Sequence, residues 1–110
     1  METLYNPFEN NAEKLRLDGH PTFKDIRELF ELTIAYYPHD EIDPRIYDIW
    51  HEDWRCIARK YTLWEFEMAS IRIRMKHGHV PVPYYLEKEC ALVRKLADDF
   101  SSGKMKFDDE

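Results

Sequence analysis

Glycine and cysteine are scarce in this sequence, and long apolar runs are missing. Its three glycines form no glycine-rich phosphate loop, which excludes that class of nucleotide-binding site. Two cysteines cannot build a disulfide framework, so we expect Cys56 and Cys90 to be reduced and buried in helices. No segment approaches the ~20 apolar residues that span a membrane, and residues 1–15 do not resemble a signal peptide. We therefore expect a cytoplasmic protein that makes no membrane contact.

The sequence also lacks a recognisable catalytic or metal-binding motif. Its serines are not set in the strand–turn–helix pattern that presents a nucleophile. His51 lacks the second histidine that a zinc-binding helix carries four residues later, because Arg55 stands there. His77 and His79 alone do not complete the four-ligand shell of a zinc site. We predict a protein that is not an enzyme and that uses no cofactor and no metal.

Aliphatic and aromatic residues at helical spacing are abundant. Apolar side chains recur every three or four positions, as they do on one face of an amphipathic helix. Each run is introduced by a capping residue or by a proline, which is tolerated in the first turn. The four predicted helix starts lie at Thr22, Asp43, Thr62 and Pro83. Because no period-two alternation is long enough to demand a strand, we predict an all-α fold, a compact bundle of four main helices.

The chain length and the residues that start or end helices define the predicted domain boundaries. Residues 22–101 are predicted to form one helical domain, since 110 residues leave no room for two independent cores. Residues 1–21 are expected to form an arm or a short helix, and residues 102–110 a flexible, disordered charged tail. Pro38 is predicted to end the first main helix. Gly78 is predicted to cap the third in the left-handed conformation.

Each predicted helix has an apolar face, and the third helix has two. A helix that is apolar on two sides is typically central and packed by neighbours on both. In the first helix the stripe consists of Ile26, Leu29, Phe30, Thr33, Tyr36 and Tyr37, and in the second of Ile46, Trp50, Trp54 and Ile57. In residues 62–77 one face consists of Leu63, Phe66, Ala69 and Ile73, and the other of Trp64, Met68, Ile71 and Met75.

Acidic residues are concentrated in one segment. The net charge of −6 disfavours a general duplex-binding protein, because phosphate neutralisation needs a basic surface. Residues 39–53 carry six acids and a single arginine. A tryptophan ringed by acids suits a basic partner surface, and the predicted partner-binding residues here are Asp40, Glu41, Asp48 and Trp50. The alternative interpretation is a solvated surface above a core tryptophan.

Basic and aromatic residues gather at the end of the third helix. Arg72, Arg74 and Lys76 precede a proline-containing turn that leads to the pair Tyr84 and Tyr85. Cationic side chains beside aromatic rings can clamp a phosphate backbone and stack on bases. We therefore predict these five residues as a weak secondary contact for nucleic acid. The alternative is a rigid connector whose prolines only set the angle between two helices.

Several motifs follow one another in a distinctive order between about residues 23 and 90. They are Phe23-x-x-Ile26-x-x-Leu29-Phe30, Tyr36-Tyr37-Pro38, a central Trp50, Thr62 with Glu65-x-x-x-Ala69, Val80-Pro-Val-Pro83 and Glu87. This order resembles the helical domain of phage replicative-helicase loader and inhibitor proteins. The resemblance is to the small loader type of phages of Gram-positive hosts and, more distantly, to the replication protein P type of lambdoid phages.

The resemblance implies a protein that binds the replicative helicase and delivers it to, or withholds it from, an origin complex. Such proteins join a helical domain to a flexible tail that contacts the helicase. In this sequence the tail is short, and Met105 and Phe107 are its apolar anchors. We predict a non-catalytic accessory protein or inhibitor in phage DNA replication, with Met105 and Phe107 among its partner-binding residues.

Two further functions are compatible with the residues alone. The acidic segment 39–53 also predicts a small acidic inhibitor that mimics nucleic acid or blocks a nucleic-acid-binding enzyme. The second apolar face of residues 62–77 also predicts an interface of a homo-oligomer.

Overall fold

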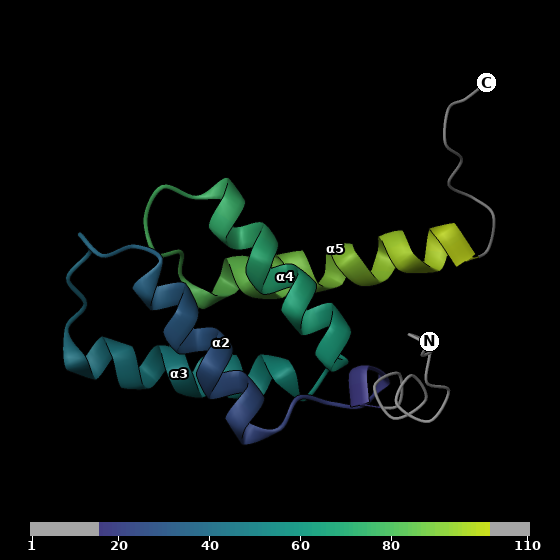
Figure 1. The fold of residues 1–110 in the computed structure, drawn as a ribbon, viewed down its shortest axis with the longest axis horizontal. Helices are drawn as coiled ribbons and strands as arrows, with labels where there is room; N and C mark the ends of the chain where they lie inside the picture. Colours follow the sequence, from purple (N-terminus) through teal and green to yellow (C-terminus); the bar gives the residue numbers. More distant parts are fainter. Residues whose placement is uncertain (1–15, 102–110) are drawn as a thin grey trace, which may run out of the picture.

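The computed structural model describes residues 16–101, which form four main helices (Figure 1). These helices are α2 (Phe23–Ala35), α3 (Pro44–Ala58), α4 (Leu63–Lys76) and α5 (Pro83–Ser101). A helical turn at residues 16–18 precedes them, and no strand occurs within the described range. The predicted all-α class is therefore confirmed. Most of the predicted arm and all of the predicted tail, including Met105 and Phe107, lie outside the described residues.

Two capping boxes start α2 and α4, as the sequence predicts. The Thr22 hydroxyl accepts a hydrogen bond from the Asp25 N–H at 3.1 Å, and the Asp25 carboxylate accepts one from the Thr22 N–H at 2.9 Å. Thr62 and Glu65 repeat this arrangement at 3.1 and 2.9 Å. Both exchanges satisfy backbone donors that the first helical turn leaves unpaired. The helix starts are thus fixed by residues three positions apart.

Removing the first cap gives a direct stability test. We expect Thr22→Ala to lower the free energy of unfolding by about 1 kcal/mol, because one N–H of the first turn of α2 loses its acceptor. Thr22→Ser keeps a hydroxyl at the same place and should stay within a few tenths of a kcal/mol of the parent chain. Urea unfolding monitored by circular dichroism measures both values. Equal losses in the two variants would show that the cap contributes nothing.

The other two main helices begin with proline. Pro44 stands at the first position of α3, and the Asp43 carboxylate accepts the Arg45 N–H at 2.8 Å. Pro83 is the first residue of α5. Proline suits this position because a helix leaves its first N–H groups unpaired in any case. The described chain therefore repeats one local design, in which a helix with a capping box is followed by a helix that starts with proline.

The end of α4 differs from the prediction. The helix ends at Lys76, the capping residue is His77 with φ −118° and ψ 139°, and Gly78 does not adopt the left-handed conformation. His77 is extended, and the Tyr37 hydroxyl donates to its carbonyl at 2.9 Å, which fixes the chain in this conformation just beyond the last turn of α4. The predicted left-handed cap at Gly78 is therefore wrong. Burial raises the pKa of the Tyr37 hydroxyl, which keeps it a donor.

The four helices pack as two crossing pairs. In Figure 1, α2 crosses α3 and α4 crosses α5, and the pairs are joined by contacts of α2 with α4 and of α3 with α5. Their shared core is built from aromatic and aliphatic side chains on all four helices. Its buried members include Ile26, Phe30, Trp54, Ile57, Phe66, Ala69, Ile73, Leu86 and Cys90. Burial of such side chains is the main stabilising contribution to a domain of this size.

Several predictions of burial are wrong. The second face of α4 is not covered, since Trp64 is 39% exposed and Met75 79% exposed, and α4 packs mainly against α5 and, less extensively, α2. Tyr36 and Ile46 are exposed, and Tyr47 takes a place against the core on α3. Helical spacing locates an apolar face but does not show which neighbour covers it.

The two cysteines also differ from each other. Cys90 is fully buried, as predicted, whereas Cys56 is exposed on α3. Trp54 and Ile57 turn the buried face of α3 toward the core, and Cys56 lies between them in sequence, on another side of the helix.

Candidate partner-binding surfaces

Two of the predicted nucleic-acid contacts are already paired within the chain. Arg72 Nε donates to Glu89 at 2.7 Å, and Lys76 Nζ donates to the second oxygen of the same carboxylate at 2.6 Å. Burial by itself raises the pKa of Glu89, but the hydrogen bonds from Lys76 and Arg72 outweigh it and lower the pKa below its ordinary value. A phosphate contact by Arg72 or Lys76 would therefore compete with a buried carboxylate.

The remaining residues of that group form an aromatic surface. Tyr84 and Tyr85 are exposed and meet edge to face, with their ring centroids 5.4 Å apart. The Arg74 guanidinium lies 6.0 Å from the centre of the Tyr36 ring. Its Nη1 atom is buried and has no hydrogen-bond partner among residues 16–101. Stacking on these tyrosines stays a prediction, since Lys88 Nζ lies 5.5 Å from the centre of the Tyr84 ring and the His77 and Tyr85 ring centroids are 4.9 Å apart.

Asp40 joins the predicted acidic segment to the predicted basic turn. One carboxylate oxygen accepts the Val80 N–H at 2.7 Å, and the other lies 3.1 Å from His79 Nδ1. The pKa of Asp40 lies below its ordinary value, mainly because the carboxylate accepts the Val80 N–H and, to a smaller extent, because of its hydrogen bond with His79. A hollow of about 610 Å³ lies at this junction, lined in part by His39, His77 and His79. The fold thus brings together two segments that the sequence presents as separate patches.

The other predicted acidic contacts are more accessible than Asp40. Glu41 and Asp48 are exposed and form no ion pair with any other residue in the described range. Trp50 is half-buried and packs against the core, so only part of its ring faces solvent. The carboxylates of Glu41 and Asp48 are therefore available to an external partner.

A groove between α4 and α5 is strongly apolar. It measures about 400 Å³, and its residues come from both helices. They are Trp64, Met68, Arg72, Val93, Leu96, Ala97, Phe100 and Ser101. The sequence predicts the second apolar face of α4 but not the groove, because helical spacing does not show which neighbouring helix lies beside that face. Phe100 is 55% exposed.

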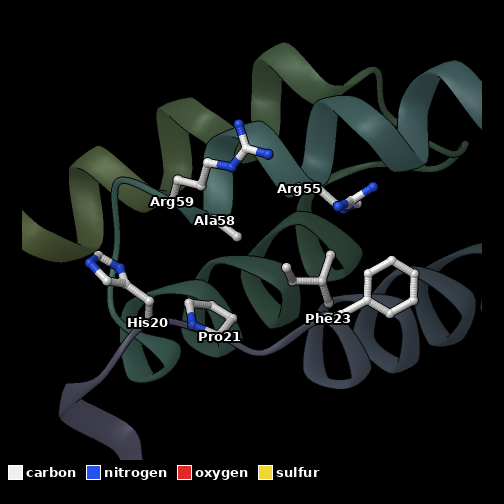
Figure 2. Close-up of a pocket in the computed structure, with 7 residues that line it drawn as sticks. His20, Pro21, Phe23, Arg55, Ala58 and Arg59 are labelled. Carbon is white, nitrogen blue, oxygen red and sulfur yellow. The ribbon is translucent and has the colours of Figure 1, made fainter.

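A smaller pocket lies where the start of α2 meets the end of α3 (Figure 2). It measures about 250 Å³, and its lining is part apolar and part basic. The lining residues are His20, Pro21, Phe23, Ile26, Arg55, Ala58 and Arg59. No pattern in the sequence predicts this pocket, since it forms only when residues about 35 positions apart meet in the fold.

No group of three or more His, Cys, Asp or Glu side chains in the described part of the chain is placed to hold a metal ion. Within the same range, no helix has the length and apolar character needed to cross a membrane.

Comparison with known protein families, with curated proteins and with solved structures gives no match. The surfaces described above are therefore the basis on which a function is inferred.

Proposed function

We propose that this chain is a non-catalytic, protein-binding accessory protein or inhibitor of phage DNA replication that contacts the replicative helicase. The replicative helicase is proposed as the partner because of the order of motifs between residues 23 and 90. The observation that supports protein binding is the apolar groove between α4 and α5. Large apolar side chains at a surface hollow are typical of protein-interaction sites.

The groove has the composition of an interface centre. Trp64 is partly exposed, and Met68 and Leu96 are half-buried beside it. Tryptophan is enriched among the residues that dominate binding energy, and methionine adapts its shape to different partners. An apolar helix face or loop of the helicase would bury these side chains. The proposed contact is hydrophobic at its centre, with Arg72 and Ser101 among the polar groups of its lining.

A double substitution in the groove tests this proposal. Trp64→Ala with Phe100→Ala removes two partly exposed rings and should weaken helicase binding about 30-fold, the effect of losing a dominant contact. Ile71→Ala is the matched control, because Ile71 is equally exposed on α4 and does not line the groove. Surface plasmon resonance with the purified host helicase measures the affinities. The absence of binding by the parent chain, or unchanged binding by the double variant, overturns the proposal.

The predicted tail contacts are tested separately. A chain that ends at Ser101 lacks Met105 and Phe107, and the same assay shows whether they add affinity. Unchanged affinity of this truncated chain removes both residues from the proposed contact and leaves the groove as its centre.

The alternative function, an acidic inhibitor of a nucleic-acid-binding enzyme, is supported by the carboxylates of Glu41 and Asp48, which form no ion pair within residues 16–101. Its test is the variant Glu41→Gln with Asp48→Asn, which should lose competition with DNA for a basic groove. Asp40 is left intact because it anchors the turn at Val80. Competition that weakens as salt rises, and that disappears in the variant, favours this function over helicase binding.

A further inference from the structure

The pocket between α2 and α3 has an apolar floor. Ile26 and Ala58 are buried there, and the Pro21 and Phe23 side chains extend the apolar lining toward solvent. Figure 2 shows Pro21 opposite Ala58 and the Phe23 ring opposite Arg55. Its volume of about 250 Å³ is just below the ordinary range for ligand pockets, about 300–1,000 Å³. The floor therefore suits one apolar side chain rather than a large ligand.

The edge of this pocket is basic in a chain whose net charge is −6. Arg55 and Arg59 stand four positions apart on one side of α3, with His20 at one end of the pocket (Figure 2). None of the seven lining residues is an acid. Arg59 is exposed and forms no ion pair with any other residue between 16 and 101. Its guanidinium is thus available to an external carboxylate. Arg55 Nη1 donates to Glu52 at 3.0 Å, but this pair is exposed and therefore weak, so that Arg55 can exchange Glu52 for a peptide carboxylate.

Two hydrogen bonds fix the position of the segment that carries His20. His20 Nδ1 lies 2.8 Å from the Tyr61 carbonyl oxygen and must donate to it, since a carbonyl only accepts. The Leu63 N–H donates to the Gly19 carbonyl at 2.7 Å. Both hydrogen bonds tie the segment before α2 to the connection between α3 and α4. The pocket is therefore preformed, which reduces the ordering cost of binding.

We propose that this pocket binds an acidic peptide segment of a protein partner, with an apolar side chain on its floor and flanking carboxylates on Arg55 and Arg59. Guanidinium groups match carboxylates in geometry and charge, and the apolar side chain replaces water over Ile26 and Ala58. The inference concerns a different surface from the α4–α5 groove. Its test is therefore independent of the test of helicase binding at the groove.

A nucleic-acid ligand fits the same surface less well. The Arg55 guanidinium already lies over the Phe23 ring, 5.0 Å from its centre, and the His51 ring packs edge-on at 5.7 Å. Base stacking needs an open aromatic face, and Arg55 and His51 already occupy two sides of the Phe23 ring. An acidic peptide meets two guanidinium groups without needing the ring face.

The test uses the full chain and a fluorescently labelled peptide, Ser-Asp-Glu-Phe-Asp-Glu-Ser, with fluorescence anisotropy as the measurement. We expect Arg55→Gln with Arg59→Gln to weaken binding at least tenfold, and Arg59→Gln alone to weaken it about threefold. The single variant is informative by itself, because Arg59 has no partner within residues 16–101 whose loss could perturb the fold. Lys88→Gln removes an equal charge from an exposed position on α5 and should bind like the parent chain.

Two peptide controls separate the two parts of the pocket. Replacing the phenylalanine of the peptide with serine should weaken binding about tenfold, and replacing its acids with amides should abolish it. The proposal is overturned if the parent chain does not bind the peptide, or if Arg59→Gln and Lys88→Gln bind it equally. Tighter binding of a single-stranded oligonucleotide than of the peptide, lost in the double arginine variant, would reassign the pocket to nucleic acid and overturn it as well.

Discussion

Replacing Trp54 with alanine is expected to lower the free energy of unfolding by about 3–5 kcal/mol, the largest effect of any substitution considered for this chain. Trp54 is 3% exposed, and its ring packs against Phe30 of α2 at 5.2 Å and Phe66 of α4 at 5.5 Å. Both contacts are edge to face, the arrangement that aromatic pairs favour. One side chain of α3 therefore connects three helices, and its removal leaves a cavity at their junction.

Urea unfolding monitored by circular dichroism measures this effect. Because domains are stable by only about 5–15 kcal/mol, Trp54→Phe serves as a milder second variant that should remain folded. Trp64→Ala is the matched control and should cost less than about 1 kcal/mol, since that ring is partly exposed on α4. Similar losses for Trp54→Ala and Trp64→Ala would contradict the central position of Trp54.

Substitution of Glu65 is expected to have the second largest effect on the free energy of unfolding. Its carboxylate accepts from the Thr62 N–H and binds Arg94 through two hydrogen bonds of 2.8 and 2.9 Å. Glu65→Ala removes these interactions and should lower the free energy of unfolding by about 2 kcal/mol, a value that allows for the partial exposure of Arg94. Glu31→Ala, which breaks an exposed pair with Arg27, is the control and should have little effect.

The same carboxylates predict how stability depends on pH. Burial raises the pKa of Glu65, but the hydrogen bonds from Arg94 and Thr62 outweigh it, so that its folded pKa lies below the ordinary value, as for Glu89. The contribution of such groups is complete above their unfolded pKa, about 4.3, and is lost as the pH falls through the folded pKa.

A double variant isolates this pH effect. Glu65→Gln with Glu89→Gln replaces two titrating groups with amides of the same size, each of which keeps one acceptor oxygen and turns the other into an NH2 donor. Between pH 7 and about pH 3, its stability should fall less than that of the parent chain, because two of the groups that link folding to proton binding are gone. Thermal unfolding at several pH values measures both curves. Parallel curves for the two proteins would contradict the assignment.

The helix starts were predictable because their causes are local. Thr22 and Thr62 each need only an acid three residues later, and Asp43 needs only the proline after it, so the sequence alone contains the information. The same holds for the burial of Trp54 at the centre of an apolar stripe.

The surfaces were less predictable because their causes are distant in sequence. Nothing near Arg72 or Lys76 indicates that Glu89 accepts from both. The contact of Asp40 with Val80 spans 40 residues and turns a predicted acidic contact into a structural anchor. The pocket of Arg55 and Arg59 exists only because residues 20–26 pack beside α3. Charge patterns in the sequence locate the charged residues but do not show which of them form ion pairs or hydrogen bonds with each other in the fold.

The unequal environments of the two cysteines allow selective chemical labelling of one of them. Burial raises the pKa of the Cys90 thiol to about 12, which keeps it protonated and shielded, whereas Cys56 is open to solvent. Since the thiolate is the reactive form, a maleimide dye at neutral pH should attach to one position only. Cys56 adjoins Arg55 in the chain, so that dye would report on occupancy of the nearby pocket in the natural sequence, without an engineered cysteine.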